Sequence, residues 1–203
     1  MAGNARDTVD ADLLLASASE RRRELLEQIG YRVSVAAADF DEQSIRSDNP
    51  MELVQRLAAA KLGIVLEHLR SIDDERVGLP AIAADTVVLR KGRIMEKPDT
   101  VDDARGMLEQ LSGGTHQVIT GVAIQLPDPP DRRPTICYAE THVSFAHLSA
   151  QEIEWYLSTN EWRGVAGGYR IQESAARFIT EIIGSYSNVV GLPLHLVYSI
   201  LSF

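Results

Sequence analysis

The sequence has little cysteine, few aromatic residues and no long hydrophobic segment. Only one of its 203 residues is a cysteine, Cys137, which excludes an intramolecular disulfide and a cysteine-based zinc cluster. The longest nearly apolar stretch, residues 189–198, contains a glycine, a proline and a histidine, and it is far shorter than the roughly 18 residues of a membrane span. Residues 1–12 are too charged for a signal peptide. We therefore expect no membrane association and a cytoplasmic location.

The charge balance is acidic, with 29 acidic against 20 basic residues and a formal charge of −9. Binding of a nucleic acid polymer requires a broad basic surface, so we expect none here. A small phosphorylated ligand needs only a local basic cluster and stays possible. The hydrophobic share of 45% is that of an ordinary globular protein. We expect residues 1–11 to form a flexible tail and residues 12–203 to form a single domain.

Short apolar strands alternate with amphipathic helices along the chain, which predicts an α/β fold with a mixed sheet. The expected helices cover residues 20–29, 49–69, 100–111, 149–158 and 189–201. The expected strands cover residues 13–16, 31–37, 81–89, 116–126, 135–145 and 176–183. Capping boxes at residues 100–103 and 149–152 and a hairpin turn at residues 91–92 support these boundaries.

Asp85 interrupts an otherwise apolar strand of alanine, isoleucine and valine. A buried carboxylate without a partner costs several kcal/mol, so this residue needs an explanation. One explanation is an acid at a strand end that caps a neighbouring turn. The other is a metal ligand or general base at the rim of a cleft, since both roles need an anionic oxygen held rigidly.

Basic residues occur at positions where a solvated face is one explanation and an anion site the other. Three arginines, residues 21–23, open the first helix, where the helix dipole disfavours cations unless an anion is bound. Lys61 lies on the second helix, and Lys97 lies in an extended segment before a proline. Each lysine alone is explained by a solvated head group on an apolar stem. Together with Asp85, these residues suit a polyanion clamp for reactions at phosphorus.

Six motifs follow one another along the chain and make a recognisable set. They are LASASERR (15–22), ADTVV (84–88), EKP (96–98), LSGGTHQVITGV (111–122), AGGYRIQ (166–172) and GSYSNVVGLP (184–193). The set resembles the Maf family of nucleoside triphosphate pyrophosphatases from about residue 13 to the C-terminus.

The resemblance implies a two-lobed, mixed-sheet α/β fold similar to that of the inosine triphosphatases, with the active site in the cleft between the lobes. It implies hydrolysis of a nucleoside triphosphate to the monophosphate and pyrophosphate, as a housekeeping reaction that removes non-standard or excess nucleotides. A divalent cation, Mg²⁺ or Mn²⁺, is the implied cofactor. A small nucleotide is the implied partner, and a homodimer is plausible.

The resemblance also assigns roles to residues of this chain. The catalytic aspartate falls on Asp85, which would bind the metal together with Glu42, the neighbour of Asp41. The residues that would bind phosphate are Ser19, Arg21, Arg22, Lys61 and Lys97. The residues that would set substrate specificity are Arg22, Thr86 and Gln172.

The specificity positions resemble the branch of the family that acts on dTTP and UTP, which carries Arg-Arg, Asp-Thr and Ile-Gln. The amide of Gln172 offers both donors and an acceptor to the edge of uracil or thymine. Two alternatives stay open. One is a pyrophosphatase of the same fold directed at purines or modified bases, and the other is a non-catalytic nucleotide-binding regulator of septum formation.

Three positions depart from the family pattern. Glu20 replaces the usual proline, Val165 replaces a lysine and Arg170 replaces a glycine. Glu20 brings a negative charge close to the expected triphosphate site. The other two lie close to the expected base pocket in the sequence.

Overall fold

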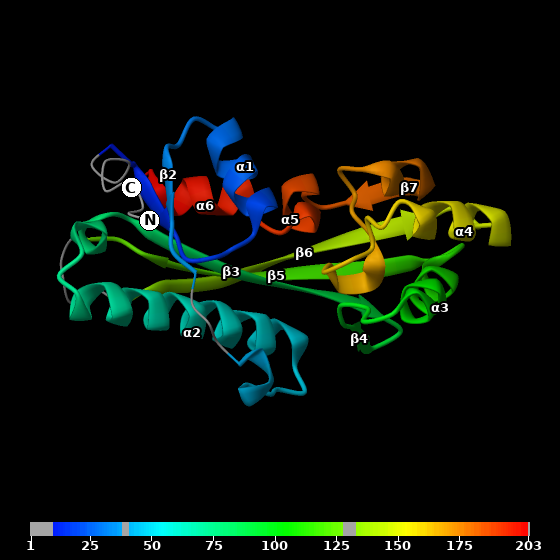
Figure 1. Ribbon diagram of the computed structural model, residues 1–203, viewed down its shortest axis with the longest axis horizontal. Coiled ribbons are helices and arrows are strands. Elements are labelled where there is room, and N and C mark those ends of the chain that lie inside the picture. The colour runs from blue at the N-terminus through cyan, green and yellow to red at the C-terminus, as the bar shows by residue number, and fades with distance from the viewer. Residues whose placement is uncertain (1–9, 38–40, 128–132, 203) are drawn as a thin grey trace, which may run out of the picture. The chain divides into compact units, whose positions relative to one another are not determined.

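The computed structural model describes residues 10–37, 41–127 and 133–202 (Figure 1). Residues 1–9 of the expected tail and residues 128–132 of the proline-rich loop lie outside the described residues. The chain forms two compact units. The first comprises Met1–Asp85, Gly121–Tyr138 and Gly191–Phe203, and the second comprises Thr86–Thr120 and Ala139–Val190.

Each unit has its own helices. The first contains β1 (Leu13–Leu15), β2 (Val33–Val35), α1 (Glu20–Gln28), α2 (Pro50–Ser71) and α6 (Leu194–Leu201). The second contains β4 (Arg93–Met95), β7 (Ile179–Ile183), α3 (Val101–Leu111), α4 (Ala150–Ser158) and α5 (Tyr186–Val190). Three long strands run from one unit into the other, namely β3 (Ala81–Arg90), β5 (Thr115–Gln125) and β6 (Thr135–Phe145).

The strands form a mixed sheet, as the sequence predicts. Their order is β2-β1-β3-β5-β6-β7, and β4 pairs with β3. Strand β1 runs parallel to both β2 and β3, with Leu14 opposite Ala81. Strands β4 and β7 run antiparallel to β3 and β6. The predicted α/β fold with a mixed sheet is therefore confirmed.

The core of the first unit lies between the sheet and helix α2. Leu62, Val65, Leu66 and Leu69 of α2 are buried in one apolar cluster with small strand residues such as Ala83. Figure 1 shows α2 along one face of the strands and α1 and α6 along the other. Because successive strand residues point to opposite faces, both faces of these short strands need apolar side chains. This explains why Leu13–Leu15 is buried throughout.

An aromatic cluster forms the core of the second unit. Tyr169 contacts Phe145 edge-on, with ring centroids 5.0 Å apart, and Phe178 contacts Tyr156 edge-on at 5.7 Å. His116 contacts Phe145 and Tyr169, and its Nε2 lies 2.8 Å from the Tyr169 hydroxyl. The histidine is 2% exposed. Burial, together with the charge of Arg90, lowers its pKa to about 4.

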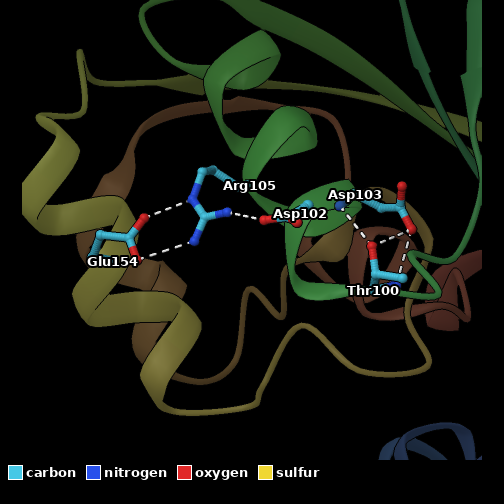
Figure 2. Close-up of polar contacts among 5 residues, drawn as sticks. All are labelled: Thr100, Asp102, Asp103, Arg105 and Glu154. Atoms are coloured by element: carbon cyan, nitrogen blue, oxygen red, sulfur yellow. Dashed lines mark hydrogen bonds and ion pairs between the residues drawn. The ribbon is translucent and has the colours of Figure 1, made fainter.

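Side-chain hydrogen bonds and ion pairs join α3 to α4 and define the start of α3 (Figure 2). Thr100 and Asp103 form the predicted capping box, in which the Thr100 hydroxyl accepts from the Asp103 amide at 3.1 Å. Arg105 of α3 donates to both carboxylate oxygens of Glu154 on α4 and also pairs with Asp102. The capping box at Ser149 is confirmed in the same way.

Three of the expected elements differ clearly from the structure. The expected strand over residues 31–37 is reduced to Val33–Val35. The expected strand over residues 176–183 begins only at Ile179, because a short 3₁₀ helix covers Ser174–Phe178. The expected helix over residues 189–201 is interrupted between α5 and α6. Gly191 has φ of +128°, which is incompatible with a helix. Pro193 does not lie inside a helical turn but caps the start of α6.

Gly121 permits the close approach of β5 to α2, and its replacement by alanine should destabilise the protein. A Cβ at this position would lie 2.4 Å from the carbonyl carbon and oxygen of Val54. We expect Gly121→Ala to lower the free energy of unfolding by roughly 3 kcal/mol, the upper end of the usual cost of overpacking. Gly63→Ala is the matched control, because Gly63 is exposed in α2 with open space around it. That variant should gain about 1 kcal/mol; equal urea midpoints for the two variants would contradict the prediction.

His116 should make the protein less stable in mild acid. Its pKa is about 4 in the folded state and about 6.5 in an unfolded chain. Between these values the unfolded state binds a proton that the folded state does not, so stability is lost as pH falls from 6.5 to 4. The loss should reach about 3 kcal/mol. Urea unfolding at stepwise pH should show a shallower decline for His116→Gln than for the original chain, and parallel curves would exclude His116 as the cause.

Candidate functional site

The carboxylate of Asp85 lies in the buried part of β3 and has a lysine as its partner. Asp85 is 8% exposed, among alanine and valine residues of the strand. Its Oδ1 lies 2.5 Å from the Nζ atom of Lys61 on α2. The ammonium group of Lys61 thus offsets the cost of burying this carboxylate. The alternative of a turn cap has no support, because none of the hydrogen bonds among the described residues joins Asp85 to a turn.

The same ammonium group bonds a second carboxylate. Lys61 Nζ lies 2.7 Å from Oε1 of Glu42, a residue of the 3₁₀ helix Glu42–Ser44. The Lys61 side chain is only 16% exposed. A lysine that merely extends along an apolar surface places its head group in water, whereas this one directs it to two anions. The neighbouring Asp41 has a different role, because its side chain caps the 3₁₀ helix by accepting from the Gln43 amide.

The position of Lys61 on α2 explains why it reaches both carboxylates. The helix begins at Pro50 after the N-cap Asn49 and buries a stripe that includes Ala58, Leu62 and Val65. Lys61 lies at the border of this stripe and is half-buried. The two carboxylate oxygens that it contacts lie at most about 5 Å apart. Two carboxylates so close repel one another, and the ammonium between them offsets this repulsion.

Arg22 supplies a second cation close to the two carboxylates. It is buried on α1, and burial lowers the pKa of its guanidinium, while the charges of Asp85 and Glu42 oppose that shift. Its Nε donates to the carbonyl of Gly191 at 2.8 Å, and its Nη1 donates to the Ser17 hydroxyl at 3.1 Å. The protein therefore holds this guanidinium in one orientation beside the two acids.

The remaining candidates on α1 lie at its start. Ser19 is the N-cap residue, although its side chain makes no capping hydrogen bond. Arg21 is half-buried. Glu20, which replaces the usual proline, is exposed and pairs with Arg23 one turn later. The extra negative charge of Glu20 is thus balanced by an adjacent arginine.

Three predicted site residues belong to the second unit. Thr86 is the first residue of β3 that belongs to the second unit. Its hydroxyl lies 3.0 Å from the hydroxyl of Thr120. Lys97 is exposed and precedes the buried Pro98. Gln172 is half-buried and follows the buried Ile171. The structure thus gathers Asp85, Glu42, Lys61 and Arg22 in the first unit, while Thr86, Lys97 and Gln172 lie in the second.

The two departures near the expected base pocket have structural partners. Val165 is 3% exposed and belongs to the core. Arg170 pairs with Glu173 at 3.1 Å and donates to the carbonyl of Arg163. Its backbone amide donates to the Tyr156 hydroxyl. These contacts explain both residues without a ligand.

Sequence reasoning missed four residues that bond to the candidates. Ser17 and Gly191 bond to Arg22, and Thr120 and Asn188 form a buried chain behind Thr86. A signal was present for Thr120, a polar residue inside an apolar stretch of one of the motifs, whereas Asn188 follows Ser185 and Ser187 in a polar stretch. Across the described residues, histidine, cysteine, aspartate and glutamate form no group of three or more arranged to hold a metal. The two sequence-predicted metal ligands, Asp85 and Glu42, both contact the Nζ atom of Lys61.

None of the helices in the described parts of the chain is both long and apolar enough to cross a membrane.

In comparisons with solved structures, the Staphylococcus aureus Ham1 protein matches with a TM-score of 0.40 and 13% identity, over 66% of this chain and 71% of that chain.

Three curated relatives match over almost the whole chain, and each is named dTTP/UTP pyrophosphatase. The protein of Chelativorans sp. (strain BNC1) is 42% identical, with 94% of this chain and 90% of the relative covered. The protein of Symbiobacterium thermophilum is 43% identical, with 90% and 89% covered. The protein of Rhizobium meliloti is 43% identical, with 92% and 89% covered.

The sequence profile described as Maf-like protein matches residues 12–202. That range spans all six motifs and every candidate residue of both units. The chain belongs to the Maf family.

Proposed function

We propose that this protein hydrolyses dTTP and UTP to the nucleoside monophosphate and pyrophosphate. The observation that carries the proposal is the group of Asp85, Lys61, Glu42 and Arg22 in a chain whose relatives, at 42–43% identity over 90% or more of its length, are named dTTP/UTP pyrophosphatase. Such a reaction removes excess or non-standard nucleotides, and we place it in the cytoplasm, where these nucleotides are used. A homodimer stays a prediction.

Asp85 is the residue that orients and deprotonates the attacking water. A rigid strand holds its carboxylate, and Lys61 bonds Oδ1, so Oδ2 is the oxygen that accepts the proton. The water oxygen bonds to the α-phosphorus as the bond from that phosphorus to the bridging oxygen breaks. Pyrophosphate leaves with the electron pair of the broken bond. A positioned general base typically contributes about 10²–10⁴-fold to the rate.

Cationic and hydroxyl groups hold the triphosphate. Arg21, Lys97 and Ser19 are the proposed phosphate ligands. Arg22 carries five N–H donors, of which Nε and one on Nη1 are used to fix its orientation. Because these two hydrogen bonds hold the guanidinium in place, its proposed contribution is a fixed positive charge beside the developing negative charge of the leaving group.

The carboxylate pair fits a divalent cation. Oxygens of Asp85 and Glu42 already converge on one cationic nitrogen, at 2.5 and 2.7 Å. Mg²⁺ is typically bound through one or two carboxylates together with substrate phosphates and water. Asp85 and Glu42 would hold the ion, and when bound it would polarise the phosphate oxygens and acidify a coordinated water.

Asp85→Asn should keep the fold and lose most of the turnover. Asparagine preserves the shape of the side chain but cannot accept the proton of water, so we expect a loss of about 10²-fold or more. The measurement is pyrophosphate against orthophosphate released from dTTP, UTP, CTP, GTP, ITP and 7-methyl-GTP with Mg²⁺ or Mn²⁺. The melting temperature reports on the fold.

Each outcome of that panel decides something. Pyrophosphate from dTTP and UTP that disappears in Asp85→Asn supports the proposal, and near-normal turnover in the variant removes Asp85 from catalysis. Release from purine nucleotides alone would favour the purine-directed alternative. Binding of nucleotide with no release from any of them would favour the non-catalytic regulator.

Glu42→Gln should also lose turnover, while Asp41→Asn, the adjacent control, should not.

Lys61→Met should strengthen binding of Mn²⁺ in the absence of nucleotide. The ammonium of Lys61 occupies the position on which the two carboxylates converge, so it competes with any metal there. Removing it should tighten Mn²⁺ binding by roughly tenfold, or about 1.4 kcal/mol, as measured by electron paramagnetic resonance of free Mn²⁺. Turnover should nevertheless fall. Lys91→Met, at the exposed turn before β4, is the control, and equal Mn²⁺ affinities in all three proteins would place the metal elsewhere.

A further inference from the structure

A buried chain of hydroxyl groups lies behind Thr86 in the second unit. The Thr86 hydroxyl lies 3.0 Å from the hydroxyl of Thr120, and Thr120 Oγ1 lies 3.1 Å from the backbone carbonyl of Asn188. Thr120 and Asn188 are both 0% exposed. Thr86, at the start of the chain of hydrogen bonds, is half-buried.

The direction of both hydrogen bonds follows from elementary chemistry. A backbone carbonyl accepts hydrogen bonds and never donates, so Thr120 must donate to Asn188. A threonine hydroxyl carries one hydrogen only, and that of Thr120 is now used. In the contact between the two threonines, Thr86 is therefore the donor and Thr120 the acceptor. Any further hydrogen bond at Thr86 Oγ1 is one that it accepts.

The carbonyl that sets this direction is held firmly in place. The side-chain amide of Asn188 donates to the carbonyl of Val118 at 3.1 Å and to the Thr141 hydroxyl at 3.0 Å. Thr141 in turn accepts from the backbone amide of Ser185 at 3.0 Å. Thr141 also donates to the Ser185 carbonyl at 3.3 Å. Counting the bond from Thr120, five hydrogen bonds thus tie Ser185 and Asn188 to β5 and β6. The polarity of the chain cannot reverse without breaking the Thr120 bond to a backbone carbonyl that is already fixed.

We propose that Thr120 is a specificity-determining positioning residue, which keeps the Thr86 hydroxyl a hydrogen-bond acceptor toward the base. The proposal rests on the proposed function and on the role that the family resemblance implies for Thr86, that of a specificity residue facing the base. Uracil and thymine carry a hydrogen on ring nitrogen N3 and donate from it, whereas cytosine has a bare N3 that only accepts. An acceptor at Thr86 accepts a hydrogen bond from N3 of uracil or thymine. Opposite cytosine, the acceptor and the bare N3 would face each other with lone pairs and repel. The Thr120–Asn188 pair therefore selects dTTP and UTP against CTP.

The side chain of Gln172 cannot make this distinction by itself. Its amide offers two donors and an acceptor, and it turns to suit either pyrimidine. A site that leaves a buried polar group mispaired rejects the wrong ligand by roughly 10⁴–10⁵-fold at best. Thr86 makes one such contact and is only half-buried, so water partly offsets the cost of the mispaired acceptor. We therefore expect kcat/KM for UTP to exceed that for CTP by roughly 10²-fold or more.

The test compares Thr120→Val with Thr120→Ser. Valine has the shape of threonine but neither donates nor accepts, so the Thr86 hydroxyl loses the acceptor that fixes the direction of its hydrogen. Serine keeps the hydroxyl. We expect the ratio of kcat/KM for UTP over CTP to fall at least about tenfold in Thr120→Val and to stay within about twofold of the original in Thr120→Ser. A purely structural defect lowers both nucleotides together and leaves this ratio unchanged.

A binding measurement separates this inference from the proposed function. Dissociation constants for non-hydrolysable UTP and CTP analogues, measured by calorimetry, report base selection without turnover. A collapsed UTP preference in Thr120→Val, restored in Thr120→Ser, supports the role of Thr120. An unchanged ratio in a folded Thr120→Val protein overturns it, as does an original protein that binds both analogues equally. Absence of pyrophosphate release with this binding pattern intact would overturn the proposed reaction and leave the role of Thr120 standing.

If Thr120→Val does not fold, Thr120→Cys takes its place. A thiol is a weak donor and a weak acceptor of nearly the same size, so it reduces the same hydrogen bond without an empty space. The expected result is the same fall in the UTP over CTP ratio, smaller in size, and an unchanged ratio contradicts the proposal.

Discussion

The ammonium group of Lys61 is the contact on which the candidate site depends. Strand β3 carries Asp85 into an apolar layer, and the 3₁₀ helix brings Glu42 within reach of the same nitrogen. Breaking a buried ion pair by removing one partner is costly, because it leaves an uncompensated charge. Asp85, whose side chain is 11% exposed, therefore depends on a cationic partner, whereas the 45% exposed side chain of Glu42 is also solvated. A divalent cation bound by Asp85 and Glu42 would compensate the same two negative charges. The stability of the fold and the proposed metal binding therefore both require positive charge next to these carboxylates.

Arg22 shows how a break in a helix serves the site. A continuous helix over residues 189–201 would bond the carbonyl of Gly191 within the helix, and Arg22 Nε would have no acceptor there. The break after α5 exposes this carbonyl, to which Arg22 donates at 2.8 Å. The interruption therefore costs helical hydrogen bonds but fixes a buried guanidinium beside Asp85 and Glu42, whose charges oppose the lowering of its pKa.

Local signals in the sequence predicted much of this fold, and long-range contacts account for what they missed. Capping boxes and the turn at Lys91 and Gly92 work through neighbours in the chain, and all of them are confirmed. The broken C-terminal helix was mispredicted because Gly191 bonds a residue 169 positions away. A motif contains Asp85, and Lys61 was a candidate from its place on the second helix. The sequence contained no sign that one ammonium joins Asp85 to Glu42, since that geometry depends on how α2 lies against β3.

The polarity of the Thr86 hydroxyl is a further property that no motif contains. A threonine donates or accepts with equal ease, so its identity alone says nothing about which base it favours. The direction is decided two residues away in the hydrogen-bond chain, at a backbone carbonyl that can only accept. Backbone groups keep their polarity whatever side chains surround them. When a chain of hydroxyl groups ends at a backbone carbonyl, the donor or acceptor role of its first hydroxyl is fixed. When the chain ends at another hydroxyl or at water, the first hydroxyl can donate to one ligand and accept from another.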